Sequence, residues 1–303
     1  MDYAAWQLFV DLTEAGSLSK VALAHGTSQP RISRRLGDLE RECGGRLFER
    51  TGRGVVPTEL GRRIAPRVRA WLASTDELAN DVRTSAGTPI GRVRIGSLPS
   101  TAHPLVTTLY YRLKRSYPQI HLSVREGQGA QIETWLDEGS VDLAFLYRTS
   151  PAPCDGDIYL VRTETYLVGA EGDPVTAGPT IPFVALRGLP LVHFCRPSSW
   201  RDRLDELAAE RGFALDVALE ADSLSLQTQA VADGGLYALL GPYAISAAVR
   251  NCRLQSSRIV DPPVTRHIAL ALSRHGVTTL ASRTVMRIAR EIATSGASGL
   301  PVV

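Results

Sequence analysis

Residues 28–43 constrain the fold most, because their apolar and polar side chains fall on opposite faces of one short predicted helix. The apolar positions recur at helical spacing: Ile32, Leu36, Leu39 and Cys43. Ser28 is the expected N-cap, and Pro30 lies in the first turn, where its missing N–H is not needed. The other face combines Gln, Ser and Arg with a glycine, so it is polar and slim enough to enter a DNA groove.

Two shorter helical patterns precede this segment. Asp2 is the predicted N-cap of the first helix, which ends at Gly16. Ser17 is the predicted N-cap of the second helix, which ends before Gly26 and Thr27. A helix, a glycine break and a helix with a polar first turn form a helix-turn-helix, in which the start of the second helix contacts base edges.

A two-stranded hairpin is predicted next, because two glycines flank Arg53 between short β-prone runs. Such a wing would bring arginines to phosphates or to a minor groove. The candidate contacts to the major groove are Ser28, Gln29, Pro30, Arg31, Ser33 and Arg34. The candidate contacts of the wing are Arg50, Thr51 and Arg53.

The charge distribution agrees with a polyanion partner. Residues 17–70 carry twelve basic and five acidic side chains, a net charge of +7, whereas the rest of the chain carries −4. A solvated arginine-rich surface is the alternative that charge alone leaves open. The four cysteines show no C-x-x-C spacing, and neither a membrane segment nor a secretory signal is visible. We therefore expect a cytoplasmic protein that has no membrane partner.

Signatures of catalysis are missing from the sequence. It contains no phosphate-binding loop, nucleophile elbow, zinc-protease motif or dinucleotide fingerprint. Its histidines do not show the spacing of metal ligands. We therefore predict that the protein is not an enzyme and that it uses neither a cofactor nor a metal.

Three N-terminal segments, residues 28–40, 47–54 and 57–61, resemble the winged helix-turn-helix of LysR-type transcriptional regulators in order, spacing and position. Two positions depart from the family pattern. His25 replaces an apolar residue, and Thr27 replaces Val or a similar residue. We expect His25 to be partly exposed and hydrogen-bonded to backbone; the alternative is a weak point in the packing that makes stability pH-dependent.

A long helix is predicted after Thr58, with an apolar stripe close to coiled-coil spacing. The stripe consists of Leu60, Ile64, Val68, Trp71, Leu78 and Val82. Pro66 lies inside the pattern and should kink the helix. We expect the stripe to pair with a second subunit; packing against its own chain is the alternative. The resemblance implies a homodimer or a dimer of dimers (a homotetramer) that reads two half-sites of an interrupted palindrome in double-stranded DNA.

Strand and helix patterns alternate from Arg92 onward, which predicts parallel strand pairing and right-handed crossovers. Two such α/β lobes, joined by strands crossing near residues 160–165 and 264–268, would form a clamshell similar to periplasmic binding proteins. The resemblance implies the same two-lobed effector domain. The expected division is a winged helix-turn-helix at 1–58, a linker helix at 59–87 and an effector domain at 88–303. Its first lobe covers about 92–161 and 266–303, and its second about 162–265.

Ligands of open α/β sheets bind beyond the carboxyl ends of strands, so residues that follow predicted strands are the effector candidates. They are Ser97, Leu98, Pro99, Ser100, Thr101, Gln128, Tyr147, Arg148, His193, Arg196, Asp222 and Ser223. Plain N-capping is the alternative for the hydroxyls. Arg148 and Arg196 are candidates for bidentate binding of a carboxylate, with surface ion pairs as the alternative. Cys195 suggests redox sensing, against which we favour an inert thiol.

These patterns and the resemblance together predict a LysR-type regulator whose DNA binding or bending responds to a small molecule held between two lobes. RNA polymerase is a further candidate partner. The alternative is a solute-binding or enzymatic α/β protein whose N-terminal helices serve only for assembly. Specific, salt-sensitive binding to DNA separates these two functions.

Overall fold

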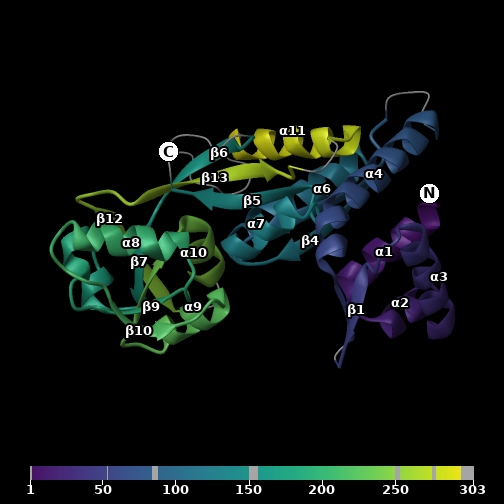
Figure 1. Cartoon of the computed structure of the whole chain (residues 1–303). Helices are drawn as coiled ribbons and strands as arrows, with labels where there is room; N and C mark the ends of the chain where they lie inside the picture. Colours follow the sequence, from purple (N-terminus) through teal and green to yellow (C-terminus); the bar gives the residue numbers. More distant parts are fainter. Residues whose placement is uncertain are drawn as a thin grey trace.

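The computed structural model describes residues 2–52, 54–83, 88–149, 156–249, 253–274 and 278–294. An N-terminal group of helices with a hairpin, one long helix and two α/β lobes follow one another along the chain (Figure 1). Across these ranges, none of the helices is both long enough and apolar enough to pass through a lipid bilayer.

The N-terminal unit contains α1 (Tyr3–Ala15), α2 (Leu18–Ala24), α3 (Gln29–Glu42), β1 (Phe48–Thr51) and β2 (Gly54–Pro57). The side chains of Asp2 and Ser17 cap α1 and α2 as predicted, accepting from the N–H groups of Ala4 and Lys20. Leu8, Phe9, Leu12, Ile32 and Leu47 are fully buried at the centre of this unit.

Two sequence-based expectations fail near the ends of α2 and α3. Cys43 is exposed rather than part of the apolar stripe, because α3 ends at Glu42 and Cys43 forms its C-cap. His25 is exposed, and its Nε2 lies 2.7 Å from Oδ2 of Asp11, so its side-chain partner is a carboxylate and not backbone. The turn closes despite Thr27, whose N–H donates to the carbonyl of Ala22.

The predicted wing is an antiparallel hairpin in which Phe48 pairs with Pro57 and Thr51 with Gly54. It is fixed to the rest of the unit by the N–H of Val55, which donates to the carbonyl of Gly16 at 2.9 Å. Arg53, expected at the tip, lies outside the described residues.

Helix α4 (Glu59–Arg83) is continuous through Pro66, and its apolar stripe divides into two parts. Leu60, Ile64 and Val68 pack against the core of the N-terminal unit. Trp71 is 40% exposed and Leu78 65%. The alternative, packing against its own chain, therefore describes the first half of the stripe, in which Leu60 and Ile64 are half-buried. The side chain of Val82 lies outside the described residues.

The first lobe has a five-stranded sheet in the order β4-β3-β5-β13-β6. Its strands are β3 (Gly91–Ser97), β4 (Ile120–Glu126), β5 (Leu143–Arg148), β6 (Ile158–Glu164) and β13 (Thr265–Leu272). Its helices are α5 (Pro99–Thr101), the π-helical turn η1 (Ala102–Val106), α6 (Thr107–Ser116), α7 (Gly129–Asp137) and α11 (Leu280–Thr294). The first four residues of β5 are all buried, as expected for a strand covered on both faces.

The second lobe has a six-stranded sheet in the order β10-β9-β11-β7-β12-β8. Its strands are β7 (Tyr166–Ala170), β8 (Thr180–Pro182), β9 (Pro190–His193), β10 (Asp216–Glu220), β11 (Tyr237–Leu240) and β12 (Leu254–Val260). The helical segments are η2 (Pro174–Thr176), η3 (Phe183–Leu186), α8 (Ser199–Ala209), α9 (Leu224–Ala232) and α10 (Pro242–Val249). The sequence pattern does not predict β6, β8, β12 or α10.

The lobes are joined by two crossing segments, β6 to β7 and β12 to β13, near the positions that the sequence predicts. The N–H of Thr165 donates to the carbonyl of Val264 at 2.9 Å, which holds the two segments together. The returning strands pair antiparallel, β13 with β5 and β6, and β7 with β11 and β12. The sequence pattern predicts parallel pairing, and the double crossover is the reason for these antiparallel pairs.

Candidate DNA-binding surface and effector cavity

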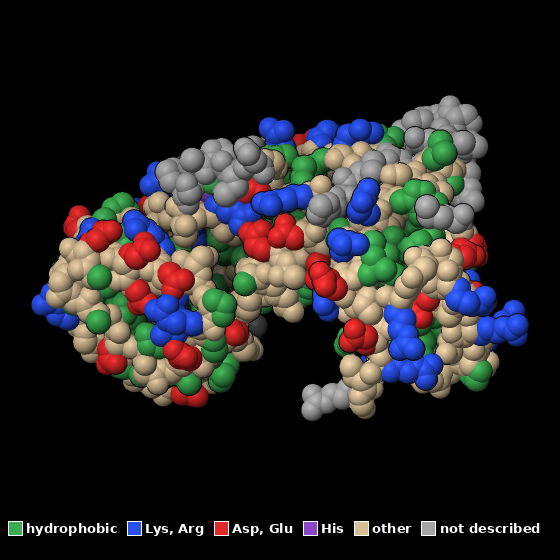
Figure 2. All heavy atoms as spheres, in the orientation of Figure 1, with side chains coloured by type: hydrophobic (Ala, Val, Ile, Leu, Met, Phe, Trp, Pro, Cys, Tyr) green, Lys and Arg blue, Asp and Glu red, His purple; other side chains and the backbone are tan. Residues whose placement is uncertain are grey.

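The polar face of α3 points away from the protein core. Of the predicted contact residues in this helix and its cap, Ser28, Gln29, Pro30, Arg31 and Arg34 are exposed and Ser33 is half-buried. The opposite face, with Ile32, Leu36 and Leu39, is buried. Figure 2 shows basic side chains gathered over this N-terminal part of the molecule.

The wing lies next to this helix. Nη2 of Arg50 donates to Oγ of Ser33 at 3.0 Å, and both Arg50 and Thr51 are exposed. Among the described residues, no carboxylate lies within ion-pair distance of Arg31, Arg34 or Arg50. The structure therefore brings together two predicted sets of residues on one cationic surface that its own acidic groups leave available for phosphates.

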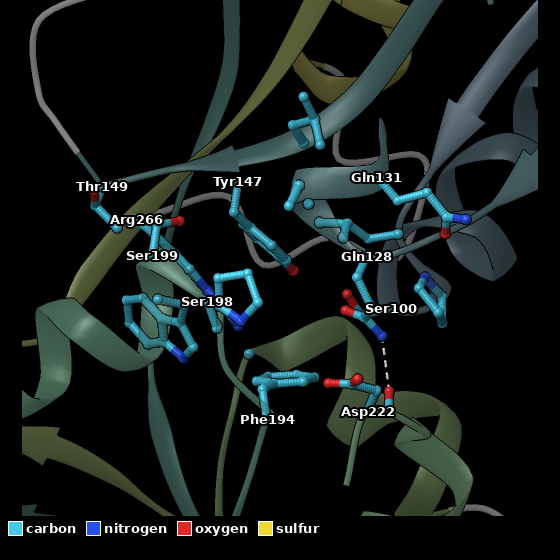
Figure 3. A pocket seen from close by; sticks show the side chains of 18 of the residues that line it. Ser100, Gln128, Gln131, Tyr147, Thr149, Phe194, Ser198, Ser199, Asp222 and Arg266 are labelled. Atoms are coloured by element: carbon cyan, nitrogen blue, oxygen red, sulfur yellow. Dashed lines mark hydrogen bonds between the residues drawn. The ribbon is translucent and has the colours of Figure 1, made fainter. Parts of the chain in front are cut away.

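A cavity of about 810 Å³ lies between the two lobes, a volume within the range of small-molecule sites (Figure 3). Eight of the predicted effector residues line it: Leu98, Pro99, Ser100, Gln128, Tyr147, Arg148, Arg196 and Asp222. Nε2 of Gln128, after β4, donates to the carbonyl of Asp222, after β10, at 2.8 Å. This hydrogen bond connects the two lobes through two residues that line the cavity.

Four predicted effector residues are not among those that line the cavity. Ser97 and Thr101 are fully buried, and their hydroxyl oxygens are 3.0 Å apart. Ser223 caps α9 by accepting from the N–H of Leu226. His193 is buried behind the wall. Capping and internal hydrogen bonds use the hydroxyls of Ser97, Thr101 and Ser223 instead.

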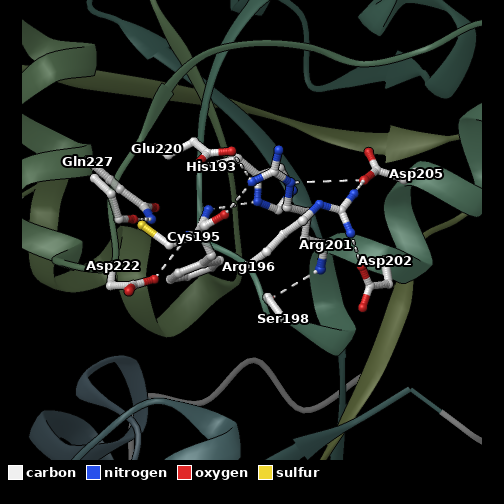
Figure 4. A network of polar contacts seen from close by, with 12 residues as sticks. His193, Cys195, Arg196, Ser198, Arg201, Asp202, Asp205, Glu220, Asp222 and Gln227 are labelled. Atoms are coloured by element: carbon white, nitrogen blue, oxygen red, sulfur yellow. Dashed lines mark hydrogen bonds and ion pairs between the residues drawn. The ribbon is translucent and has the colours of Figure 1, made fainter.

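Both arginines predicted to bind a carboxylate already have carboxylate partners. Arg148 pairs with Glu133 and, at 2.6 Å, with Asp157. Arg196 pairs with Asp202 and, at 2.5 Å, with Asp205 (Figure 4). The ion-pair alternative is therefore the correct interpretation of both side chains. The effector domain itself supplies both sets of acids.

Arg266 is one of the cavity residues that the sequence pattern does not predict. It begins the buried part of β13 and is 6% exposed, yet it contributes to the cavity wall. The available signal was its position: an arginine stands at the predicted crossover, just before the apolar run from Ile268 to Leu272. A charged residue entering a buried strand needs a partner or a function.

His193 belongs to a polar network behind the cavity wall (Figure 4). Its Nδ1 accepts from the N–H of Phe194 at 2.8 Å. Arg201 donates to the carbonyl of Phe194 at 3.0 Å and to Glu220 at 2.5 Å. Burial, followed by the charges of Arg201 and other nearby arginines, lowers the pKa of His193 to about 4. The imidazole is therefore neutral at pH 7.

We expect His193 to make the protein less stable in mild acid. The pKa of His193 is lower in the folded state than its ordinary value of 6.5. Its contribution to the free energy of unfolding is therefore complete above pH 6.5 and is lost as the pH falls toward about 4. Uptake of one proton on unfolding gives a slope of at most about 1.4 kcal/mol per pH unit. Unfolding free energies of wild type and His193→Gln between pH 7 and pH 4.5 check this.

The matched control for this pH dependence is His121→Gln, since His121 is exposed on β4. His193→Gln should flatten the acid limb of the stability curve, and His121→Gln should leave it as in wild type. Identical acid limbs for wild type and His193→Gln would show that His193 is not the group that titrates.

Cys195 also lines the cavity, but its surroundings oppose thiolate formation. Its N–H donates to Oδ1 of Asp222 at 3.0 Å. Burial and the adjacent Asp222 carboxylate raise the pKa of the thiol. Because the thiolate is the reactive form, this favours the inert-thiol interpretation. Within the described ranges, no three His, Cys, Asp or Glu side chains are grouped as metal ligands.

Two family descriptions match most of the chain. Residues 3–62 match the description "Bacterial regulatory helix-turn-helix protein, lysR family", and residues 86–294 match "LysR substrate binding domain". The chain is 28% identical to the nitrogen assimilation regulatory protein nac of Escherichia coli over 90% of this chain and 88% of that one. It is 30% identical to a probable hydrogen peroxide-inducible genes activator of Streptomyces viridosporus over 89% of this chain and 87% of that one.

Solved structures support the same fold. Full-length OxyR from Pseudomonas aeruginosa superposes with a TM-score of 0.74 at 18% identity, covering 97% of this chain and 94% of that one. Full-length CbnR in complex with its target DNA superposes with a TM-score of 0.66 at 18% identity, covering 97% of this chain and all of that one. The relatives named above are regulators and not enzymes.

Proposed function

Because the chain belongs to the LysR family of DNA-binding transcriptional regulators, we propose that the first turn of α3 reads base edges in a major groove and that the wing contacts the backbone beside it. The observation that carries this proposal is the exposure of Arg31 and Arg34 next to Arg50, which the Ser33 hydrogen bond holds alongside α3. Gln29 and Arg34 supply the side-chain types that pair with adenine and guanine edges.

The proposed division of labour follows the three units of the chain. Residues 1–58 bind DNA, 59–87 join two subunits, and 88–303 hold the effector. A small molecule in the cavity changes the balance between two arrangements of the assembly, since it binds one of them more tightly. We expect this activity in the cytoplasm, where RNA polymerase is the candidate that receives the signal.

The test of DNA reading is a selection from random duplexes with the purified full-length protein. The proposal expects enrichment of an interrupted palindrome whose half-sites lie about one helical turn, or a multiple of it, apart. Affinity for that duplex should fall steeply as salt rises, because phosphate contacts release counterions. Recovery of unselected sequences, with equal affinity for all duplexes, would contradict the proposal.

We expect the exposed half of α4 to hold a dimer. Trp71 and Leu78 present apolar surface on a helix whose first half already packs on its own chain. Leu78→Lys places a charge in that interface and should shift the protein toward monomer at micromolar concentration in sedimentation equilibrium.

Leu23→Lys is the matched control for the dimer, because Leu23 is 84% exposed on α2, away from this stripe. It should keep the wild-type association. A Leu78→Lys variant that associates as tightly as wild type would place the dimer contact elsewhere.

A further inference from the structure

Arg266 brings a guanidinium to the place where both lobes and the crossing segments meet. Its strand, β13, pairs it with Thr163 of β6, inside the crossing segments. Its Cζ lies 3.8 Å from the ring centroid of Tyr147 in β5 of the first lobe. It also lies 4.4 Å from the ring centroid of Trp200 in α8 of the second lobe.

The charge of this guanidinium is not balanced by the part of the chain that the structure describes. No carboxylate in that part lies within 4.0 Å of it, in contrast to the ion pairs of Arg148 and Arg196. The side chain is 6% exposed, and Nε has no hydrogen-bond partner there. Burial lowers the pKa of Arg266, which reports the cost of holding this charge away from water. A buried cation of this kind calls for an anion.

The wall around Arg266 is built with room for the guanidinium. A Cβ added at Gly241 would lie 2.8 Å from Nη2 of Arg266 and 3.4 Å from the hydroxyl of Tyr147. The Arg266 guanidinium and the Tyr147 hydroxyl therefore both lie next to the backbone of Gly241, where no side chain intervenes. Within the described residues the Tyr147 hydroxyl is buried and has no hydrogen-bond partner, so it is a second donor beside the cation.

We propose that the effector is a small monoanion with an apolar body, whose carboxylate or similar oxyanion binds Arg266 beside the Tyr147 hydroxyl. This proposal rests on the effector cavity of the proposed function and names the chemistry that fills it. Because one guanidinium in the cavity wall lacks a carboxylate partner, the preferred charge of the effector is −1. Leu98, Phe194 and Leu240 line the same cavity and supply apolar contacts for the body.

This position gives the anion a direct connection to both lobes. The guanidinium stacks on one ring from each lobe, and Gln128 of the first lobe already donates a hydrogen bond to Asp222 of the second. An anion on Arg266 therefore favours the arrangement in which the lobes are closed around it. An anion that binds this closed arrangement more tightly biases the whole regulator.

The experiment compares acids with their neutral amides at constant ionic strength: benzoate with benzamide, and hexanoate with hexanamide. Thermal unfolding of full-length wild type should shift upward by a few degrees with a millimolar acid and not with its amide. The dianion phthalate should shift it less than benzoate does. Equal shifts for acid and amide, or no shift with either acid, would overturn the proposal.

Variants then assign the effect to this residue. Arg266→Gln should weaken acid binding at least about tenfold, while the ligand-free protein melts no lower than wild type because an unbalanced buried charge is gone. Gly241→Ala keeps the charge but crowds Nη2, and it should also weaken acid binding. Arg203→Gln is the matched control, because Arg203 lies on α8, pairs with Glu206 and is not among the residues that line the cavity; it should bind the acids like wild type. Acid binding by Arg266→Gln within twofold of wild type would overturn the assignment.

Failure of this proposal is distinguishable from failure of the proposed function. If wild-type protein selects a specific duplex (its operator) but responds equally to acids and amides, the DNA-reading proposal stands and the monoanion proposal is wrong. If the protein binds acids through Arg266 but selects no operator, the monoanion proposal stands and the DNA-reading proposal is wrong. If Arg266→Gln does not fold, the comparison of acid with amide on wild type decides the ligand class by itself.

Discussion

Arg34→Ala should lose most of the preference for the selected operator while the protein stays folded and dimeric. Arg34 is exposed on the polar face of α3, opposite the buried Ile32 and Leu36, so its removal leaves no cavity in the core. Loss of one base contact costs about 1–3 kcal/mol, which is roughly a 5- to 150-fold loss of affinity. Fluorescence anisotropy with operator and scrambled duplexes measures both the affinity and the preference.

Arg41→Ala is the matched control for this experiment. Arg41 lies in the last turn of the same helix and pairs with Asp38. Its removal changes the net charge by the same amount but should leave sequence preference intact. If Arg34→Ala and Arg41→Ala discriminate operator from scrambled duplex as well as wild type does, α3 is not the reading helix.

Gly54→Ala should detach the wing from the helices, and we expect its effect on stability to be large. Gly54 has a φ of +140°, a backbone conformation that residues other than glycine rarely adopt. A Cβ added at this position would lie 2.2 Å from the carbonyl oxygen of Gly16. The Gly16 carbonyl cannot shift away without cost, because it also accepts a hydrogen bond from the N–H of Val55 at 2.9 Å. Backbone strain and overpacking together should cost about 2–4 kcal/mol.

Hydrogen exchange of the full-length protein reports this change locally. The amide of Val55 should exchange much faster in Gly54→Ala, and operator affinity should fall because Arg50 loses its place beside Ser33. Gly52→Ala is the control, since its Cβ would meet nothing within 4 Å. Wild-type exchange at Val55 in Gly54→Ala would mean that the wing is not held in this way.

The N-terminal unit is the part of the molecule that the sequence predicts best. Its signals are local: Asp2 and Ser17 as caps, and the spacing of Ile32, Leu36 and Leu39. The side-chain partner of His25 is less predictable, because Asp11 lies on another helix and meets His25 only after packing. The same holds for α4, where spacing shows an apolar stripe but not which protein surface covers each half.

The cavity was harder to predict, since long-range contacts decide which polar groups face a ligand. Strand ends give the correct neighbourhood, and Ser100, Gln128 and Tyr147 line the cavity. The choice of arginine fails, because the carboxylates that neutralise Arg148 and Arg196 are brought to them by the fold. Charge balance around a buried side chain depends on the complete packing and not on local sequence.

Hydroxyl-radical footprinting of full-length protein on the selected operator tests the central claim most directly. If α3 enters the major groove and Arg50 of the wing contacts the adjoining backbone, the cleavage pattern should show two protected segments related by two-fold symmetry. Their centres should lie about one helical turn, or a multiple of it, apart. Uniform protection along the duplex, or the same pattern on a scrambled sequence, would contradict the account.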